Sequence, residues 1–418
     1  MDRFIIEGPC RLKGEVRISG SKNASLPIIV ATILAPGTYN LKNVPDLRDI
    51  KTILTILKGF GISFSYSKGS LTIDTHKITG YKAPYELIKT MRASIYCMGP
   101  LLARVRKAEV ALPGGCAIGV RPVDLHLKGF QKLGAKISLK EGTIYASAKT
   151  LKGTEIYLEK TSVGATANIL MAAVLASGTT KIYNASMDPD VIDLIHFLKK
   201  MGASIEGEGT NVITIHGRKK LNPADYTIMP DRIEAGTFLI ASAITAGEVT
   251  LKNCKTEHLT NVFNVLTKTG CRIITKDSST VTIYGPKRPS AVDITTSPWP
   301  GFPTDLQPQM TALLSIAKGV SIINETIFEN RFLHIAELNR MGANIQHDDS
   351  IAIVNGVKSL KGAPVMASDL RNGASLVIAA LKAKGKTIID RIYHIDRGYE
   401  RLEEKLCSLG AKIKRVKT

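Results

Sequence analysis

The stretch D-L-R-D-I-K-T-I-L-T-I-L-K-G-F-G-I-S-F-S-Y, residues 46–66, holds the pattern that decides the fold. Its first part places apolar residues at helical spacing, and the part after Gly61 alternates in the way of a strand. A glycine between the two can take the left-handed conformation that ends a helix and turns the chain. The stretch therefore predicts a helix, a glycine turn and a strand in succession.

The same pattern, [LF]-x-x-x-G-[AIC]-x-[IF], occurs six times along the chain. Its glycines recur about every 70 residues, which indicates an internal structural repeat. In each copy a short strand pattern, an apolar helix pattern and a second strand pattern come first, so the repeat is predicted to be β-α-β-α-β-β. The six glycines are Gly61, Gly134, Gly202, Gly270, Gly342 and Gly410.

Each unit has two further landmarks ahead of this pattern. A glycine is expected just before the middle strand, as in A-P-G-T-Y-N-L, but the second copy, A-R-V-R-K-A-E-V-A-L, has Ala108 where that glycine is expected. The first helix of each unit is almost entirely apolar, as in A-S-L-P-I-I-V-A-T-I-L, residues 24–34. A helix that is apolar on all sides belongs inside, surrounded by sheets.

One unit is too small to bury its own helices, so three units are expected to form each domain. The predicted fold class is α/β, with two inside-out α/β barrel-like domains of three repeats each. The predicted domains are residues 22–229 and residues 1–21 plus 230–418, with the active site in the cleft between them. The segment E-V-R-I-S-G, residues 15–20, has no local partner and is predicted to pair with the last unit, which would bring both termini into one domain.

The composition is that of a globular protein. Hydrophobic residues make up 44% of the 418 residues, and no apolar run reaches the roughly 18 residues that a membrane helix needs. The N-terminal segment M-D-R-F-I-I-E-G-P-C lacks the apolar core of a signal peptide, so a cytoplasmic location is expected. The six cysteines include no C-x-x-C pair, so we expect neither a zinc site nor disulfides.

The net charge of +20, from 56 basic and 36 acidic residues, favours anionic partners such as nucleic acid or phosphorylated metabolites. The basic residues are spread along the chain without an arginine-rich arm. Motifs of the types G-x-x-x-x-G-K-[ST] and strand-linked G-x-G-x-x-G are absent, so neither nucleoside triphosphate hydrolysis nor NAD chemistry is supported. A non-catalytic basic protein that binds polyanions stays open as an alternative.

Candidate functional groups gather in one glycine-rich loop and at the starts of the buried helices. The loop P-G-G-C-A-I-G-V-R-P-V-D, residues 113–124, has three glycines that let backbone N–H groups approach a ligand, and it contains Cys116 and Arg121. Lys22 and Arg92 stand at predicted helix starts, where a positive charge opposes the helix dipole. Both fit better as ligands of an anion than as structural residues.

Acidic residues stand at three further helix starts: Asp231, Asp305 and Asp369. Aspartate is a preferred N-cap, so each of them has a structural interpretation. Asp305 fits that interpretation least, because it follows the proline-stiffened turn G-F-P-T. The other polar groups at helix starts are Asn23, Ser162, Arg371 and Arg397.

Together these motifs resemble the UDP-N-acetylglucosamine enolpyruvyl transferase (1-carboxyvinyltransferase) family. The resemblance covers essentially the whole chain and implies the enolpyruvyl transferase fold and the first committed step of peptidoglycan synthesis. It rests on the segments G-S-K-N-A, M-R-A-S, P-G-G-C-x-I-G-x-R-P-V-D-L-H, S-V-G-A-T, P-D-R-I-E, F-P-T-D, F-E-N-R-F and D-R-I-Y-H-I-D-R-G-Y-E-R.

The resemblance also implies roles for single residues. Cys116 is expected to protonate C3 of phosphoenolpyruvate, with a covalent adduct as its other possible role, and Asp305 is expected to take the proton of the sugar 3-hydroxyl. Lys22 and Arg397 complete the catalytic set, and Asp369 is expected to line the closed cleft. The residues expected to bind phosphoenolpyruvate are Lys22, Asn23, Arg121, Arg331, Arg371 and Arg397. The residues expected to contact UDP-N-acetylglucosamine are Asn23, Arg92, Arg121, Pro122, Val123, Asp124, Leu125, Ser162, Val163, Asp305 and Ile327.

The implied reaction needs no metal or other cofactor, and its partners are the two small-molecule substrates, without nucleic acid or a membrane span. A monomer is expected. A second enzyme class, 5-enolpyruvylshikimate-3-phosphate synthase, shares the repeats and the donor. The cysteine loop and the absence of an N-A-G-T-A-M-R segment argue against that class.

Overall fold

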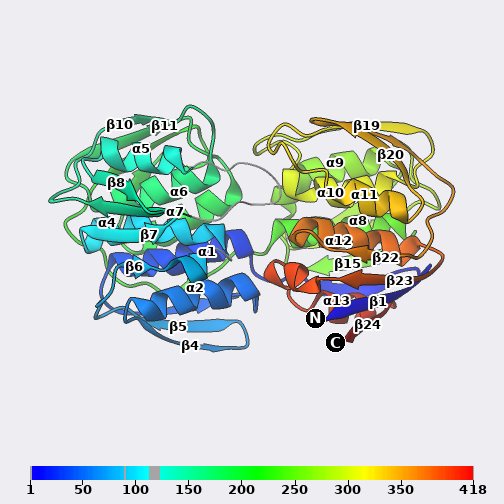
Figure 1. The fold of residues 1–418 in the computed structure, drawn as a ribbon, viewed down its shortest axis with the longest axis horizontal. Helices are drawn as coiled ribbons and strands as arrows, with labels where there is room; N and C mark the ends of the chain where they lie inside the picture. The colour runs from blue at the N-terminus through cyan, green and yellow to red at the C-terminus, as the bar shows by residue number, and fades with distance from the viewer. Residues whose placement is uncertain (1, 89–90, 113–122, 418) are drawn as a thin grey trace. The chain divides into compact units, whose positions relative to one another are not determined.

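The structure is a computed structural model that describes residues 2–88, 91–112 and 123–417 (Figure 1). The described chain forms two compact units. We call residues 2–19 with 230–417 the terminal unit, because it holds both ends of the chain. We call residues 20–229, without the two gaps, the middle unit. Each unit contains three of the six repeats.

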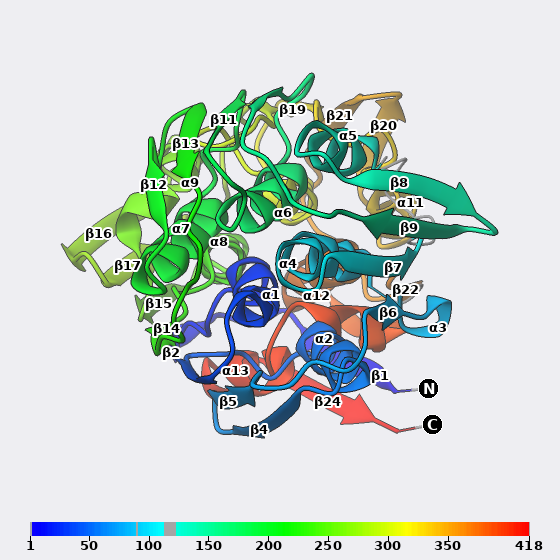
Figure 2. The same ribbon diagram turned by 90° about the vertical axis from the view of Figure 1, so that its left-hand side faces the viewer.

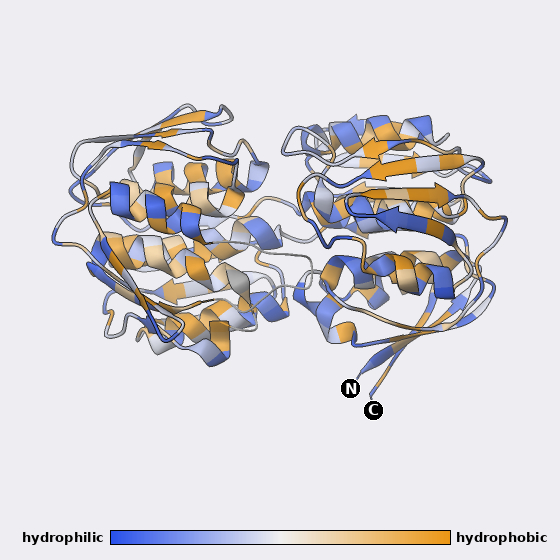
Figure 3. Cartoon of the chain, turned by 45° about the horizontal axis from the view of Figure 1, so that its top comes forward, coloured by the Kyte–Doolittle hydropathy of each residue, from blue (hydrophilic) through white to orange (hydrophobic). Residues whose placement is uncertain are grey.

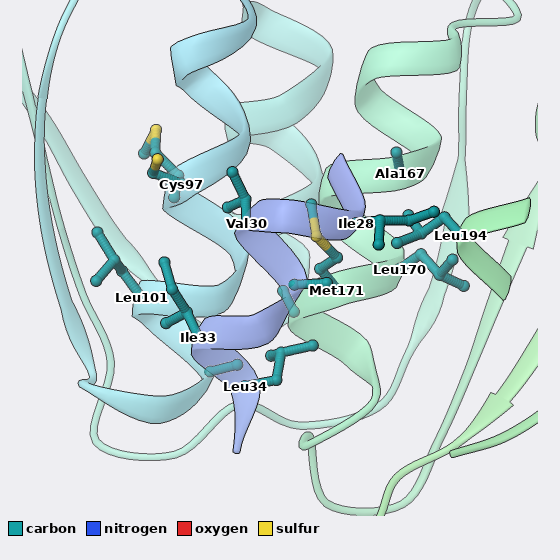
Figure 4. Packing of buried hydrophobic residues seen from close by; sticks show 14 of the residues in the cluster. Ile28, Val30, Ile33, Leu34, Cys97, Leu101, Ala167, Leu170, Met171 and Leu194 are labelled. Atoms are coloured by element: carbon teal, nitrogen blue, oxygen red, sulfur yellow. The ribbon is translucent and has the colours of Figure 1, made fainter. Parts of the chain in front are cut away.

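Each unit has three inner helices, and nearly all of their residues are buried. Figure 4 shows apolar side chains of the middle unit meeting between them, among them Ile28, Leu101 and Leu170. This confirms that the first long helix of each repeat lies inside. No helix of the described residues is both long enough and apolar enough to cross a bilayer. The inner helices are α1 (Lys22–Ala31), α4 (Met98–Arg104) and α6 (Val163–Ala173) in the middle unit, and α8 (Arg232–Ile244), α10 (Gln307–Leu314) and α12 (Leu370–Lys382) in the terminal unit.

The second helix of each repeat is amphipathic, with one buried and one exposed face. The predicted glycine follows each of these helices, and all six glycines have φ between +83° and +99°. The glycine turn is therefore confirmed in every repeat. These helices are α2 (Arg48–Gly59), α5 (Asp124–Lys132), α7 (Pro189–Lys200), α9 (Thr260–Lys268), α11 (His334–Arg340) and α13 (Leu402–Ser408). Shorter helices are α3 (Tyr85–Ile88) and the 3-10 turns η1 (Thr32–Leu34), η2 (Arg92–Cys97), η3 (Thr256–Leu259), η4 (Thr304–Leu306) and η5 (Ile392–Arg397).

The strands of the described residues form six separate four-stranded sheets with one common order, and no closed barrel is found among them. In each sheet one edge strand runs parallel to its neighbour, and two antiparallel strands follow. Figure 2 shows the strands of the middle unit around its inner helices. Its sheets are β14 (Tyr226–Thr227), β3 (Thr38–Lys42), β5 (Ser70–Asp74), β4 (Ser63–Ser67); β6 (Lys82–Ala83), β7 (Lys107–Ala111), β9 (Thr143–Ser147), β8 (Lys136–Lys140); and β10 (Glu155–Tyr157), β11 (Thr179–Tyr183), β13 (Val212–His216), β12 (Ser204–Glu206).

The terminal unit repeats this arrangement. Hydrophobic and hydrophilic residues alternate along many of its strands, so that one face of each sheet packs on the helices (Figure 3). Its sheets are β2 (Lys13–Arg17), β15 (Glu248–Lys252), β17 (Thr280–Tyr284), β16 (Arg272–Asp277); β18 (Ile294–Thr295), β19 (Val320–Asn324), β21 (Ile351–Asn355), β20 (Asn344–Asp348); and β22 (Pro364–Met366), β23 (Gly385–Asp390), β1 (Arg3–Gly8), β24 (Lys412–Val416).

Two edge strands belong to a different repeat from the helix that follows them in the chain. The strand β2 comes just before α1, yet it pairs in parallel with β15 of the fourth repeat. The strand β14 comes just before α8, yet it pairs with β3 of the first repeat. The prediction that E-V-R-I-S-G pairs with the last repeat is therefore wrong, because β1 fills that place between β23 and β24.

In the second repeat, a residue other than glycine has the positive φ before the middle strand. The residue before β7 that has a positive φ is Arg106, at +66°, and not Ala108. Ala108 is instead a buried strand residue, which pairs with Ala146 of β9. The expectation that Ala108 takes the glycine position is wrong, because the residue with positive φ lies two positions earlier, directly before β7.

A turn glycine and a helical glycine of the middle unit predict opposite effects for two Gly→Ala changes. A Cβ at Gly202 would meet no atom within 4 Å, but its φ is +99°, so Gly202→Ala is expected to cost about 1 kcal/mol of strain. Gly59 ends α2 on an exposed face, also with open space around a Cβ. Gly59→Ala is expected to stabilise by about 0.5 kcal/mol. Urea midpoints measure both, and a loss at both positions would contradict the assigned backbone conformations.

Candidate active site

In the middle unit, Lys22 is the first residue of α1, and its side chain is buried. Its Nζ lies 2.9 Å from Oδ2 of Asp49, in the first turn of α2. The N-cap of α1 is Ser21, whose hydroxyl accepts from the N–H of Ala24 and donates to Asp190. Asn23 is the second residue of the helix. A buried lysine is therefore fixed at the positive end of a helix, where it and the helix dipole both favour an anion.

The start of α6 carries two further predicted residues. Ser162 is the N-cap, with its hydroxyl 3.2 Å from the N–H of Ala165, and Val163 begins the helix. The helix is held against the first turn of α5, because Asn168 lies 3.0 Å from the ring of His126. The three predicted residues at the start of α5 are Val123, Asp124 and Leu125.

In the terminal unit, Asp305 lies between two arginines. Arg331 donates to Oδ1 of Asp305 at 2.8 Å, and Arg371 donates to Oδ2 through Nε at 3.1 Å and Nη2 at 2.9 Å. Both arginine side chains are 2% exposed, whereas that of Asp305 is 26% exposed. The carboxylate of Asp305 is therefore the solvent-exposed member of a cluster in which both positive charges are buried.

The two arginines have donor groups beyond those that Asp305 uses. Nε of Arg331 and Nη1 of Arg371 are buried and have no hydrogen-bond partner among the described residues. Arg371 also lies over the ring of Tyr399, 5.3 Å from its centroid. Burial lowers the pKa of Arg371, but Asp305, Tyr399 and Asp231 together more than offset this and raise it above its usual value. Two permanent cations thus offer N–H groups next to a partly exposed carboxylate, which suits an anionic ligand.

The three aspartates at helix starts divide into two kinds. Asp231 caps α8 by accepting from the N–H groups of Ile233 and Glu234, and Asp369 caps α12 in the same way. Asp305 lies in η4 ahead of α10 and caps no helix with its side chain. The N-cap interpretation is confirmed for the first two and wrong for Asp305, because its carboxylate pairs with the two arginines.

Arg397 ends η5, directly before Gly398. A Cβ at Gly398 would lie 3.6 Å from Nη1 of Arg371, so this turn packs against the start of α12. The structure thus brings the Arg397 segment to the arginine cluster. Ile327 lies in the turn between β19 and Arg331, and its N–H donates to Glu325.

The segment of the glycine-rich loop that holds the predicted thiol lies outside the part of the chain that the structure describes. Cys116, Arg121 and Pro122 lie outside the described residues, and so does the side chain of Arg92, although its backbone begins η2. Among the other cysteines, Cys97 is fully buried, and this burial raises the pKa of its thiol to about 12. Burial likewise raises the pKa of Cys10 and that of Cys254 to about 11. These three thiols are protonated and unreactive at neutral pH.

Sequence reasoning missed two carboxylates that touch predicted site residues. In the sequence, Asp49 looks like any other charged residue of an amphipathic helix. Only the fold places its carboxylate against Lys22. Glu325 precedes the F-E-N-R-F motif and is 2% exposed. Both missed groups are buried acids, and no local pattern distinguishes a buried acid from a solvated one.

Comparison with known proteins identifies the family and the fold of this chain. The family model described as EPSP synthase (3-phosphoshikimate 1-carboxyvinyltransferase) matches residues 6–406. The solved enolpyruvyl transferase NikO from Streptomyces tendae has a TM-score of 0.91 and 27% identity, covering 100% of this chain and 99% of its own. An EPSP synthase from Acinetobacter baumannii, with a TM-score of 0.79 and full coverage of both chains, is 21% identical and bears on the fold alone.

Curated relatives are more similar in sequence. UDP-N-acetylglucosamine 1-carboxyvinyltransferase 2 of Carboxydothermus hydrogenoformans is 53% identical over 417 residues, covering 100% of both chains. UDP-N-acetylglucosamine 1-carboxyvinyltransferase of Geobacter metallireducens is 51% identical with the same coverage. With a matching family model, matching full-length relatives and the six-repeat fold, this chain belongs to the EPSP synthase family of enolpyruvyl transferases.

Proposed function

We propose that this chain transfers the enolpyruvyl group of phosphoenolpyruvate to the 3-hydroxyl of UDP-N-acetylglucosamine and releases phosphate. The observation that carries the proposal is the identity of 51–53% over the full length to relatives named for this reaction. The reaction would be the first committed step of peptidoglycan synthesis, in the cytoplasm. The 5-enolpyruvylshikimate-3-phosphate synthase alternative has weaker support, since such an enzyme shares 21% of its sequence with this chain.

The proposed chemistry is an addition followed by an elimination. A proton from the thiol of Cys116 goes to C3 of the donor, which makes C2 electrophilic. Asp305 takes the proton of the sugar 3-hydroxyl as its oxygen bonds to C2, giving a tetrahedral intermediate that still carries the phosphate. The thiolate left on Cys116 then takes a proton from C3, and phosphate departs with the C2–O electron pair, which restores the double bond and the thiol. No step oxidises or reduces a group.

The fixed cations have two proposed tasks. Lys22, Arg121 and Arg397 would hold the phosphate and the carboxylate of the donor and stabilise the phosphate as it leaves. Arg331 and Arg371 would add the N–H groups that no described residue uses. Their contacts with Asp305 favour its carboxylate form, which is the form that accepts a proton. A donor anion that draws these guanidinium groups away would leave that carboxylate readier to take the proton.

Phosphate release with alternative acceptors tests the proposal. The purified chain with phosphoenolpyruvate is expected to release phosphate when UDP-N-acetylglucosamine is added and not when shikimate 3-phosphate is added. The polyanion-binding alternative instead predicts no turnover with either acceptor and salt-sensitive binding to generic polyanions. Turnover with shikimate 3-phosphate alone would replace the proposed acceptor.

A further inference from the structure

We propose that Glu325 is a positioning residue for the acceptor side of this reaction. In this role the buried carboxylate of Glu325 fixes the position of Asp305 and of the turn at Ile327. This role rests on the proposed function. Glu325 itself touches neither substrate. It acts through the two segments that it holds together.

The carboxylate of Glu325 is buried and accepts four hydrogen bonds. Its Oε1 accepts from the hydroxyl of Thr296 at 2.9 Å, the N–H of Ile327 at 2.9 Å and the N–H of Phe328 at 3.3 Å. Its Oε2 accepts from the hydroxyl of Thr304 at 2.9 Å. An ionised carboxylate is an acceptor-only group, so four donors suit it well. No ion pair to Glu325 is found among the described residues, and hydrogen bonds alone satisfy its burial.

These four bonds link the two segments that form the Asp305 cluster. Thr304 is the residue directly before Asp305 in η4. Ile327 and Phe328 begin the turn that leads to Arg331, whose guanidinium pairs with Asp305. A closed loop of contacts therefore runs from Glu325 through Thr304 and Asp305 to Arg331 and back along the chain. Moving Glu325 would release Asp305 from one side and Arg331 from the other.

Glu325 is itself fixed to the sheet. It follows the last residue of β19, and its N–H donates to the carbonyl of Ser350 at 2.8 Å. The next residue, Thr326, exchanges two hydrogen bonds with Thr296, at 2.9 and 2.7 Å. A site side chain that is held by a group on a rigid element keeps its geometry within the narrow range that catalysis needs. The β18–β19 end of the sheet is thus the support for the proposed base.

The same contacts decide which group of Ile327 can meet a ligand. Its N–H is used by Glu325, so a polar contact from this residue to the acceptor would run through its carbonyl oxygen. A carbonyl accepts, and it would therefore select a ligand N–H or O–H group. Loss of Glu325 would remove the acceptor that holds the N–H groups of Ile327 and Phe328, and the carbonyl of Ile327 would change direction.

Conservative substitutions test the role. Glu325→Gln keeps an oxygen for the three Oε1 donors and places an NH₂ against Thr304, whose hydroxyl can accept, so kcat is expected to stay within about threefold. Glu325→Ala removes all four bonds, and kcat is expected to fall about 100-fold as Asp305 shifts. Thr304→Val is isosteric and removes one bond next to Asp305. It is expected to lower kcat about tenfold with little change in either KM.

The matched control is Thr250→Val in the same unit, which removes the Thr250–Thr282 hydroxyl contact on β15 and β17. It is expected to leave kcat and both KM values unchanged. If Glu325→Ala does not fold, Thr304→Val and Glu325→Gln still decide the question. Normal kcat in Thr304→Val, or equal damage from Gln and from Ala in folded proteins, would overturn the role of Glu325. A wild-type chain without turnover would instead count against the proposed function.

Discussion

Asp305→Asn is expected to lower kcat for phosphate release with UDP-N-acetylglucosamine by about 10³-fold, within the range that a positioned general base contributes. The amide cannot accept the hydroxyl proton, yet it has nearly the shape of the carboxylate. It still offers an oxygen to one of the two arginines. KM for the donor is expected to change much less than kcat, because Arg331 and Arg371 stay in place.

The same substitution is expected to destabilise the terminal unit. Arg331 and Arg371 would keep two buried positive charges near each other without a counter-charge, at a cost of about 2 kcal/mol. The control is Asp277→Asn, at the exposed end of β16 in the same unit, where an amide oxygen can still accept from Ser279. A variant of Asp305 that retains more than a tenth of wild-type kcat would remove it from the role of base.

Lys22→Met is expected to lower kcat/KM for phosphoenolpyruvate by about 10²–10³-fold, the usual loss when one preorganised group that stabilises developing charge is removed. It should also destabilise the middle unit by about 2 kcal/mol, because the buried carboxylate of Asp49 loses its cation. Both effects are measurable, by steady-state kinetics and by urea unfolding.

The double variant Lys22→Met with Asp49→Asn separates these two effects. Removing the second charge is expected to restore most of the lost stability, because no uncompensated buried charge remains. Activity is expected to stay low, since the positive charge at the start of α1 is still missing. Recovery of activity together with stability would show that Lys22 is only a structural partner of Asp49.

The sequence by itself determined the repeat architecture of this protein. The helix, glycine and strand pattern around Gly61 is local: apolar spacing sets the helix, and the absence of a Cβ lets the glycine take positive φ. The same signal recurs six times, so errors in one copy are corrected by the others. The apolar first helices, such as residues 24–34, likewise indicated burial before any contact was known.

Only the tertiary structure decided which strands complete which sheets. The edge strands β2 and β14 pair through backbone groups, which carry no sequence-specific signal for one partner over another. This is why E-V-R-I-S-G was assigned to the wrong repeat. The glycine position of the second repeat was also out of reach, since Arg106 adopts a positive φ that nothing in its side chain predicts.

The candidate site was also predictable from the sequence only in part. Its residue types and helix-start positions follow from sequence motifs, but the partners of Asp305 lie 26 and 66 residues away along the chain. The fold alone brings Lys22 to Asp49, and Glu325 to the two segments of the Asp305 cluster. A local sequence pattern indicates only where a residue lies in its own helix or strand. The pairing of buried charges depends on long-range packing, which only the folded chain specifies.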